Sequence, residues 1–426
     1  MNEINVKYLI IGAGISGLSF ASRIKDDYLI IEKENEIGGY CRTIKQGDFI
    51  WDYAGHFYHF KEKELMDEFV SSIGEENLIK QQKDTKIMYK NLKIHYPFQS
   101  NIHELDKEEF IECLYDLYNK DEKEFYDNFL DMLYGKFGKA IVEKFLKPYN
   151  EKLYACNLKT LDKDAMGRFF PYAKLEDVIN NMKDNKDNSY NNQFMYPNQG
   201  AQSFIDYIYS KLDKNKIRLS EKIENINIKE RYVITNKGTK IKYSYLINTS
   251  PLNTFLKLFN EEEYTNLSKE LSYNKVLVFN LGFKDESKHK EHWMYIPDKN
   301  INFYRIGFYN NILLSNKLSM YIEIGFDKDE EIDVDKHLKL TLENLEKLGI
   351  TENNELEEYN YVIMNPAYVH INGRHITKIQ EVFSEFENND VYSIGRYGAW
   401  KYCSMEDCVL DAINLVKKIG GIKNEN

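Results

Sequence analysis

The sequence is poor in cysteine, in surplus positive charge and in long apolar runs, and each shortage narrows what this chain can be. Its five cysteines are scattered over 426 residues and form no Cys-x-x-Cys pair. This usage fits a reducing compartment and argues against both a disulfide framework and a zinc site, so we expect no bound metal.

Positive charge is also in deficit. The chain has 57 Lys and Arg residues against 68 Asp and Glu residues, a net charge of −11. A nucleic-acid partner needs a surplus of cations that neutralise its phosphates, so we expect no such partner. A small anionic ligand stays open, because a local arginine cluster can sit inside an acidic protein.

No apolar run is long enough to cross a membrane. The longest, around Tyr8–Ala21, is broken by three glycines and falls short of the ~18 residues that a span needs. Met1 leads directly into a predicted strand, without the charged segment or cleavage site of a signal peptide. We therefore expect a soluble, cytoplasmic protein without membrane insertion. Its length predicts more than one domain.

Aromatic residues, in contrast, are abundant, with 33 tyrosines and 24 phenylalanines. Core packing explains most of them. Tyrosines that lie inside polar motifs are better candidates for a binding site, because a hydroxyl on an aromatic ring can both stack and donate a hydrogen bond.

The N-terminal segment is typical of a strand, a turn, a helix and a second strand. Val6–Ile11 is an apolar, β-branched run, Gly12–Gly17 is glycine-rich, Leu18–Ile24 is predicted to be helical, and Tyr28–Glu32 is the second strand.

The turn carries Gly12-Ala-Gly14-Ile-Ser16-Gly17, and Glu32 lies twenty residues beyond the first glycine. The first glycine permits the tight turn, the second lets the backbone approach a pyrophosphate, and the third lets the helix pack on the strand. The helix N-terminus then stabilises phosphate charge, and the acidic residue accepts the ribose hydroxyls. This pattern predicts a dinucleotide site that includes Gly12, Gly14, Ser16, Gly17 and Glu32.

The sequence continues as Glu32-Lys33-Glu34-Asn35-Glu36-Ile37-Gly38-Gly39-Tyr40-Cys41-Arg42. An acidic residue, a spacer, paired glycines and an arginine resemble the FAD-binding signature of the amine-oxidase-like flavoproteins. The resemblance implies FAD rather than NAD as the tightly bound cofactor. It also implies that Lys33, Gly39 and Arg42 bind this cofactor, with the arginine near the pyrophosphate or the ring.

Further elements follow from periodicity. Three- and four-residue spacings from Ile102 to about Tyr154 predict a small helical domain. Strands are predicted at Ile223–Ile228, Tyr232–Thr235, Lys240–Asn248, Val276–Phe283, Asn302–Tyr309, Ser319–Phe326 and Val391–Ile394, helices at Glu62–Gly74, Gln202–Leu212, Asp333–Leu348 and Met405–Ile419, and a loop at Asp184–Gln193.

These elements predict an α/β fold, with a Rossmann-type FAD-binding domain, an inserted helical domain and an antiparallel β-sheet substrate domain. The expected boundaries are 1–100 plus 200–260 and 385–426 for the FAD-binding domain, 101–185 for the helical insert, and 186–199 plus 261–384 for the substrate domain.

A series of short motifs runs along the whole chain in a fixed order. It comprises Tyr53-Ala54-Gly55-His56, Tyr96-Pro97-Phe98-Gln99, Pro148-Tyr149-Asn150-Glu151-Lys152-Leu153-Tyr154, Met166-Gly167-Arg168, Trp293-Met294-Tyr295, Phe303-Tyr304-Arg305, Ala367-Tyr368 and Gly395-Arg396-Tyr397-Gly398-Ala399-Trp400-Lys401-Tyr402. Each motif alone is weakly specific. Together and in this order they resemble the UDP-galactopyranose mutases, and more the eukaryotic-type branch than the common bacterial one.

The residue types in these motifs suit a nucleotide diphosphate. Cationic forks and hydroxyl donors for the diphosphate could come from Arg168, Arg305, Tyr295, Tyr368 and Tyr402. An aromatic platform and amide groups for the nucleobase could come from Tyr96, Gln99, Phe145, Asn150 and Tyr154.

The resemblance implies a reaction without net oxidation. N5 of the reduced flavin would attack the anomeric carbon of a nucleotide-linked sugar, and the resulting adduct would open and reclose as the other ring size. His56, Arg168 and Arg305 are the catalytic residues that it implies, while Gly55, His56 and Arg396 would lie against the flavin. NADPH or NADH would serve as a transient reductant, the product would feed cell-surface glycan biosynthesis, and a homo-oligomer stays open.

Departures from the family pattern leave the sugar open. Cys403-Ser404-Met405-Glu406-Asp407 replaces a stretch that contains Asn or Gln in the family, and the surroundings of Tyr368 also differ. UDP-galactose is the leading substrate, with UDP-N-acetylgalactosamine, UDP-arabinose and GDP- or dTDP-linked sugars as alternatives.

Two other functional classes remain. One is an FAD-dependent amine oxidase or desaturase, which would need an apolar substrate channel and no convergent arginines. The other is a non-catalytic flavin-binding or sensor protein, which the density of polar motifs disfavours.

Overall fold

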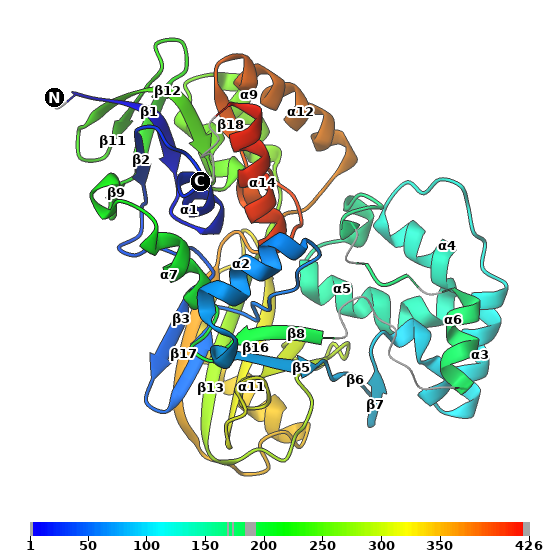
Figure 1. The fold of residues 1–426 in the computed structure, drawn as a ribbon. Helices are drawn as coiled ribbons and strands as arrows, with labels where there is room; N and C mark the ends of the chain where they lie inside the picture. Colours follow the sequence, from blue (N-terminus) through cyan, green and yellow to red (C-terminus); the bar gives the residue numbers. More distant parts are fainter. Residues whose placement is uncertain (1–2, 168–169, 173, 184–192, 421–426) are drawn as a thin grey trace.

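The N-terminal lobe is built on a parallel strand pair joined by a glycine turn (Figure 1). The computed structural model describes residues 3–167, 170–172, 174–183 and 193–420. β1 (Glu3–Ile11) runs beside β2 (Tyr28–Ile31), and α1 (Ile15–Ala21) connects them. The predicted order of elements is confirmed. The helix begins earlier than the predicted Leu18, because the glycines confine the turn to fewer residues.

Strands from distant parts of the chain complete this sheet. Its order is β10-β11-β12-β1-β2-β9, with β18 beside β12. The bounds of the added strands are Ile217–Arg218 (β9), Ile223–Asn227 (β10), Tyr232–Thr235 (β11), Lys240–Asn248 (β12) and Val391–Ser393 (β18). β12 and β18 run parallel to β1, while β10, β11 and β12 form an antiparallel meander. All but β9 coincide with predicted strands to within a residue.

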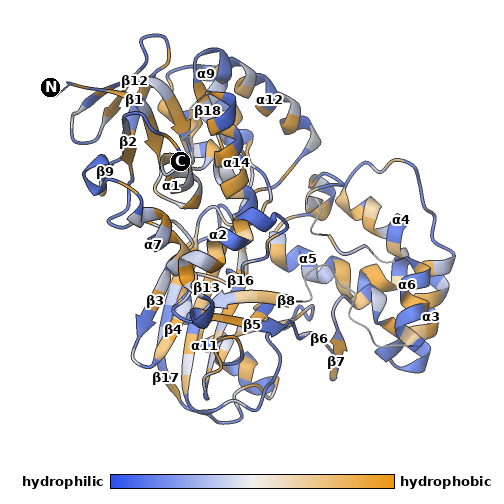
Figure 2. Cartoon of the chain, in the orientation of Figure 1, coloured by the Kyte–Doolittle hydropathy of each residue, from blue (hydrophilic) through white to orange (hydrophobic). Residues whose placement is uncertain are grey.

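Helices cover both faces of this sheet, and alternate residues of β1 show how. Tyr8 and Ile10 pack against α1, α2 (Lys63–Ile73), α7 (Gln202–Ser210) and α14 (Met405–Lys418). Leu9 and Ile11 face the opposite way, against α8 (Leu252–Phe255), α9 (Glu262–Glu270) and α12 (Gly373–Asn388). Burial on both sides explains the continuous apolar run at the end of β1. In Figure 2 the hydrophobic colour accordingly lies on the strands of this sheet.

The second large sheet forms the lower lobe in Figure 1, and its strand order is β17-β13-β16-β15-β14-β6-β7. Its strands are Thr85–Tyr89 (β6), Leu92–His95 (β7), Asn274–Glu286 (β13), Trp293–Tyr295 (β14), Arg305–Phe308 (β15), Lys317–Asp327 (β16) and Leu356–Met364 (β17), accompanied by the helices Tyr309–Leu313 (α10) and Val334–Lys347 (α11). All neighbours pair antiparallel except β14 and β6. β6 and β7 come from residues expected in the FAD-binding domain, so the chain enters this lobe earlier than the sequence indicates.

β17 is an edge strand that the sequence pattern does not predict. Its tyrosines Tyr359 and Tyr361 and its Ile363 are 43%, 48% and 38% exposed. Val362 and Met364, on the other face, pack against the core. Apolar residues therefore occupy both faces of this strand, and the alternation typical of a half-buried strand is missing.

The helical insert projects to one side in Figure 1. It contains α3 (Lys107–Tyr118), α4 (Phe129–Ile141), a π-helical turn η4 (Val142–Leu146), α5 (Lys147–Tyr154) and α6 (Leu175–Lys183). α4 is kinked at Gly138, whose φ of 74° and close approach to the Asp116 carbonyl leave no room for a Cβ. Helical periodicity therefore predicts this insert correctly.

Smaller elements join the lobes. They are the hairpin β3 (Thr43–Gln46) and β4 (Phe49–Asp52), the pair β5 (Leu78–Gln82) and β8 (Gln193–Pro197), the short helix α13 (Gly395–Gly398), and the 3-10 turns at Glu75–Asn77, Phe98–Ser100 (η2), Ile102–Glu104, Leu158–Thr160, Lys214–Lys216 and Leu256–Leu258.

The expected fold class is confirmed as mixed α/β with a Rossmann-type lobe, a helical insert and a largely antiparallel sheet. The domain boundaries stay predictions, and the loop expected at Asp184–Gln193 lies, but for its last residue, outside the described residues. Within the described ranges, no helix has both the length and the apolarity to cross a membrane.

Candidate active site

The three glycines of the turn after β1 differ in their surroundings, and only Gly14 has free space where a Cβ would lie. Gly12 has a φ of +102°, which favours glycine. A Cβ on Gly17 would lie 2.1 Å from the Gly12 carbonyl oxygen, so this position needs glycine for the helix to pack on the turn. A Cβ on Gly14, in contrast, would meet only the Gly39 Cα, at 4.0 Å. The protein itself does not require glycine at Gly14, whereas a ligand on the turn would.

The acidic residue after β2 faces the glycine turn. Glu32 is 8% exposed, and its carboxylate accepts hydrogen bonds from the backbone N–H of Ala13 (2.7 Å) and of Glu34 (2.9 Å). It therefore lies at the glycine turn, where it can also accept ribose hydroxyls. Lys33 points away, into an exposed ion pair with Glu34. Ser16 lies in α1 against Gly395, where a Cβ would come within 2.2 Å of its Oγ.

The paired glycines lie beside the turn. Gly38 has a φ of +106° and Gly39 a φ of +58°, and Gly38 forms a bridge with Gly14. Arg42 holds this loop closed, because its Nε donates to the Ile37 carbonyl at 2.9 Å and its Nη2 to the neighbouring carbonyl of Glu36 at 2.5 Å. Arg42 thus shapes the loop, and its expected contact with a pyrophosphate or ring stays a prediction.

A second group of predicted residues gathers where the three lobes meet. Tyr295 and Arg305 are cross-strand partners on β14 and β15. Tyr368 comes from the segment after β17, and Arg396 and Tyr402 come from α13 and the segment after it. The Tyr368 and Tyr402 rings stack at 5.8 Å, and the Arg396 guanidinium lies 5.1 Å and 4.7 Å from their centroids.

Arg305 is held by a buried carboxylate. Its Nη2 lies 2.5 Å from Glu323 Oε1 on β16, and Glu323 is only 1% exposed. Burial is the largest single influence and opposes the positive charge, but Glu323 and the surrounding tyrosines together outweigh it and raise the pKa of Arg305 above its usual value. The Arg305 Nε is buried without a hydrogen-bond partner. The guanidinium is therefore fixed and charged, with one donor still available.

Arg396 is placed differently. Its Nη1 donates to the Cys403 carbonyl at 3.3 Å and its Nη2 to the Ala367 carbonyl at 3.5 Å. In the part of the chain that the structure describes, it forms no ion pair with a carboxylate, and its Nε is buried without a partner. This leaves a cation among tyrosine rings. An anion could neutralise its charge, and an electron-rich ring could stack on it.

His56 lies in the same region, after β4. Burial lowers its pKa to about 4, and the charges of Arg396 and Arg305 also lower it. Its Nδ1–H donates to the Ala54 carbonyl at 2.9 Å, so Nε2 is the unprotonated nitrogen. A Cβ on the preceding Gly55 would lie 2.2 Å from the Tyr321 hydroxyl, and this close approach explains the glycine.

Aromatic rings from the helical insert and from the segment after β7 complete the site. Tyr149 contacts Tyr295 at 5.2 Å, and Tyr96 contacts the same ring at 5.1 Å. Tyr154 contacts Tyr368 at 6.0 Å, and its buried hydroxyl has no hydrogen-bond partner. Burial raises the pKa of both Tyr149 and Tyr154, so their hydroxyls stay protonated donors.

The other residues predicted for a nucleobase lie deeper. Phe145 is 3% exposed and stacks on both Phe98 (5.1 Å) and Tyr149 (5.3 Å). Gln99 and Asn150 are also buried, and each has a side-chain oxygen without a partner. Phe145 therefore supports the site through packing, and its direct stacking on a base stays a prediction.

Not every site residue follows from the sequence motifs. Arg168, predicted as catalytic, lies outside the described residues. Glu323 and Tyr149, in contrast, are part of the site although the sequence did not single them out. Tyr149 adjoins the predicted Asn150 in its motif, but a single buried glutamate in an apolar strand gives no comparable signal.

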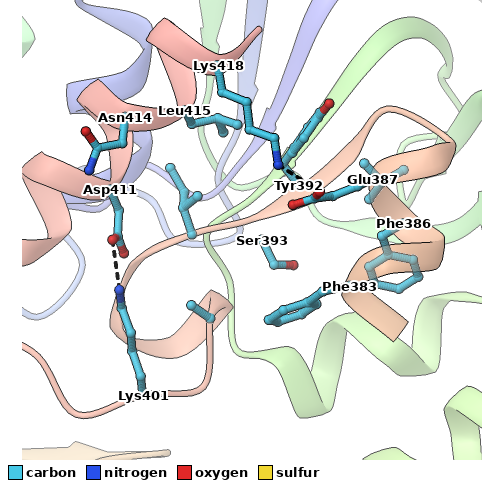
Figure 3. Close-up of a pocket in the computed structure, with 13 residues that line it drawn as sticks. Phe383, Phe386, Glu387, Tyr392, Ser393, Lys401, Asp411, Asn414, Leu415 and Lys418 are labelled. Carbon is cyan, nitrogen blue, oxygen red and sulfur yellow. Dashed lines mark hydrogen bonds and ion pairs between the residues drawn. The ribbon is translucent and has the colours of Figure 1, made fainter. Parts of the chain in front are cut away.

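A separate hollow of about 290 Å³ lies between α12, β18 and α14 (Figure 3). Phe383, Phe386 and Leu415 contribute apolar surface to it. Its rim carries the ion pairs Lys401–Asp411 (2.8 Å) and Lys418–Glu387 (2.7 Å). None of the predicted site residues that the structure describes lines this hollow, so it is distinct from the site above.

The lobes, the glycine turn and the acidic residue after β2 define a fold that is shared with a UDP-galactopyranose mutase and with several oxidases of known structure. A family model described as an NAD(P)-binding Rossmann-like domain matches residues 10–72. The chain is similar to a reduced UDP-galactopyranose mutase, with a TM-score of 0.91 and 21% identity over 99% of this chain and 95% of that one.

Two further structures share the fold at lower similarity. One is provisionally named a protoporphyrinogen oxidase, from Exiguobacterium sp. 255-15 (TM-score 0.75, 17% identity, 97% of this chain and 98% of that one). The other is the cyclohexylamine oxidase of Brevibacterium oxydans IH-35A (TM-score 0.69, 13% identity, 97% and 99%). At these identities the likeness establishes the fold, and the chemistry must be argued from the site.

Proposed function

We propose that this chain is an FAD-dependent nucleotide-sugar mutase that interconverts pyranose and furanose forms, with UDP-galactose as the leading substrate. One observation carries the proposal. Two arginines, Arg305 and Arg396, lie in a single tyrosine-rich site where the three lobes meet. Such an arrangement suits a diphosphate beside a flavin.

The residues at the glycine turn fit FAD. Gly14 has open space where a pyrophosphate would approach, and the N-terminus of α1 points to it. Glu32 would bind the ribose hydroxyls. At the other end, the orphaned Nε of Arg396 and the half-buried Nε2 of His56 could face the flavin ring.

The substrate's diphosphate would lie against Arg305, with hydroxyl donors from Tyr295, Tyr368 and Tyr402. Arg168 remains part of this proposal as the second cation. The uridine end would extend toward the helical insert, where Tyr96 and Tyr154 offer ring faces. Gln99, Asn150 and the Tyr154 hydroxyl offer buried polar atoms without a hydrogen-bond partner, with Phe145 behind them.

When bound and reduced, the flavin would supply a nucleophilic N5 and end the cycle in the same redox state. The protein's task is positioning. Glu323 fixes Arg305, and the tyrosines keep the diphosphate beside the sugar while its ring is open. Neutral His56 offers an acceptor at Nε2 without adding charge. A nicotinamide cofactor would bind only transiently, to reduce the flavin in the cytoplasm.

The alternative is an amine oxidase or desaturase, which shares the fold. Such an enzyme would need an apolar channel at the flavin. The pair of arginines and the unpaired tyrosine hydroxyl of Tyr154 make this site polar instead.

The test is anaerobic incubation of the dithionite-reduced protein with UDP-galactofuranose, followed by chromatographic separation of the products. Formation of UDP-galactopyranose only with reduced flavin supports the proposal and its sugar. If UDP perturbs the flavin spectrum without conversion, another nucleotide sugar is the substrate. If UDP leaves the spectrum unchanged, the oxidase alternative replaces the mutase.

A further inference from the structure

Two of the five cysteines meet behind the glycine turn. Cys403 lies in the segment between α13 and α14, Cys408 lies at the end of the first turn of α14, and their Sγ atoms are 3.8 Å apart. Both are buried. Cys41, which follows the paired glycines, belongs to the same hydrophobic cluster. The proposed reaction uses none of these thiols.

The two thiols differ in reactivity. A hydrogen bond from the Cys403 thiol lowers the pKa of Cys408, and the Ser16 hydroxyl and the backbone N–H of Arg396 lower it further, although burial opposes this. The N-terminus of α14 adds partial positive charge. Cys408 is therefore the more acidic of the two thiols, and Cys403 is the thiol in contact with it.

By contrast, the other cysteines lack this environment. Cys113 is fully buried in the helical insert, and burial raises the pKa of its thiol. Burial likewise raises the pKa of Cys156 to about 11 and places that of Cys41 higher still. A mild oxidant should consequently distinguish Cys408 from these three.

The pair is also tied to the candidate active site. Arg396 donates a hydrogen bond to the carbonyl of Cys403. The adjacent Gly395 presses so closely on Ser16 that a Cβ there would lie 2.2 Å from its Oγ. Because this segment is packed against α1, we expect a movement of the Cys403 backbone toward Cys408 to reach Arg396 through this hydrogen bond.

We propose that Cys403 and Cys408 form a modification site, a reversible disulfide produced by hydrogen peroxide. The Cys408 thiolate attacks one peroxide oxygen, the O–O bond breaks, and a sulfenic acid and hydroxide result. The Cys403 sulfur then attacks the Cys408 sulfur. The S–S bond forms, the S–O bond breaks, and the Cys403 proton leaves with the hydroxyl group as water.

The electron count balances. The two cysteines together lose two electrons, and one peroxide is reduced to two waters once the first hydroxide is protonated. A dithiol such as dithiothreitol restores both thiols by exchange. The formation of the disulfide does not depend on the proposed function. The displacement of Arg396 and the change in the flavin environment that we expect from it do rest on that function.

The experiment uses the full-length protein with its bound cofactor. It is titrated with hydrogen peroxide, free thiols are blocked with N-ethylmaleimide, and the protein is digested with trypsin. Both cysteines fall on the single peptide 402–417, because cleavage follows Lys401 and Lys417. We expect this peptide to lose two hydrogen atoms, to take up no maleimide, and to recover both labels after dithiothreitol.

Matched variants test the assignment. Cys403→Ser should stop disulfide formation and leave Cys408 as a sulfenic or sulfinic acid, whereas Cys113→Ser should behave as the parent does. Two maleimides on peptide 402–417 after peroxide, or a cross-link from Cys408 to Cys41, would overturn the proposal.

A second measurement tests whether the disulfide also changes the environment of the bound flavin. The absorbance spectrum of bound flavin is compared before oxidation, after oxidation and after dithiothreitol, with Cys403→Ser as control. A reversible shift that the control lacks supports the link to Arg396. A disulfide without such a shift overturns that link, while mutase activity of the reduced protein reports separately on the proposed function.

Discussion

Arg305 and Glu323 are cross-strand partners on β15 and β16, and their side chains form an ion pair of 2.5 Å between Nη2 and Oε1. The glutamate is almost fully buried, whereas the arginine is partly accessible. A buried carboxylate thus fixes the direction of a cation that faces the candidate active site. Removing either partner leaves the other charge without compensation.

Glu323→Gln should therefore destabilise the protein by about 3 kcal/mol, the cost of breaking a buried ion pair. The glutamine keeps the shape but leaves the Arg305 charge unpaired. Urea unfolding, compared with the parent, measures the change. The exposed Glu357→Gln, whose partner is Lys317 at the surface, serves as the control and should stay within ~0.5 kcal/mol. Equal, small effects of both variants would show that the buried pair contributes no more than a surface one.

Arg305→Ala should weaken UDP binding about 100-fold, the order expected for the loss of charge-assisted hydrogen bonds to a phosphate. Flavin content should stay unchanged, because Arg305 lies on the second sheet, away from the glycine turn. Calorimetric titration with UDP provides the measurement. Arg231→Ala, which breaks a surface ion pair with Asp390, should bind UDP as the parent does. Unaltered UDP binding by Arg305→Ala would remove this residue from the diphosphate site.

Gly14→Ala and Gly17→Ala should separate cofactor binding from folding. A Cβ on Gly17 collides with the Gly12 carbonyl, so Gly17→Ala should lower stability by about 2 kcal/mol or more through strain. A Cβ on Gly14 has room in the protein, so Gly14→Ala should fold with near-parent stability yet lose bound flavin. Thermal melts of flavin-free protein and flavin content after purification test both. Full flavin content in Gly14→Ala would contradict a pyrophosphate at this turn.

Asp52 should make stability depend on pH. It is fully buried, and burial raises its pKa to about 7, although hydrogen bonds from Thr43, Tyr196 and Ala201 oppose the shift. Since the folded pKa exceeds the unfolded one, the unfolded state loses this proton first. The contribution of Asp52 to stability is therefore fully present below pH ~4 and is lost as pH rises to about 7, by up to ~4 kcal/mol.

The measurement is urea unfolding of the parent and of Asp52→Asn between pH 4 and 8. The variant should lack this decline, so its free energy of unfolding relative to that of the parent should increase as pH rises. Asp48→Asn, at an exposed site, should follow the parent. Parallel curves for parent and Asp52→Asn would show that Asp52 keeps an ordinary pKa.

His56 should remain neutral well below the usual range of histidine, because burial lowers its pKa to about 4. Nitrogen chemical shifts in a histidine-labelled sample should show Nδ1 protonated and Nε2 bare from pH 8 down to pH ~5. The His56→Gln variant assigns the signal. Protonation of His56 near pH 6.5 would mean that this site is more polar than its burial indicates.

Local patterns account for much of the fold. The glycine turn, its flanking strands and Glu32 lie within a short stretch of chain, so spacing alone predicts them. Helical periodicity likewise predicts α3 to α5. It is also present in α12, where Ile379, Val382 and Phe386 are buried at three- and four-residue spacings, although the predicted helices do not include this one. β17 has no such signal, because apolar residues occupy both of its faces.

Contiguous residues and their chemistry are enough to specify the dinucleotide turn and the residue types of the site. The folded chain is needed to show that Glu323 pairs with Arg305, that Tyr154 contacts Tyr368, and that Cys403 contacts Cys408. These contacts depend on strand register and on how the lobes close on one another. Packing of many distant residues sets that arrangement, and no local pattern encodes it.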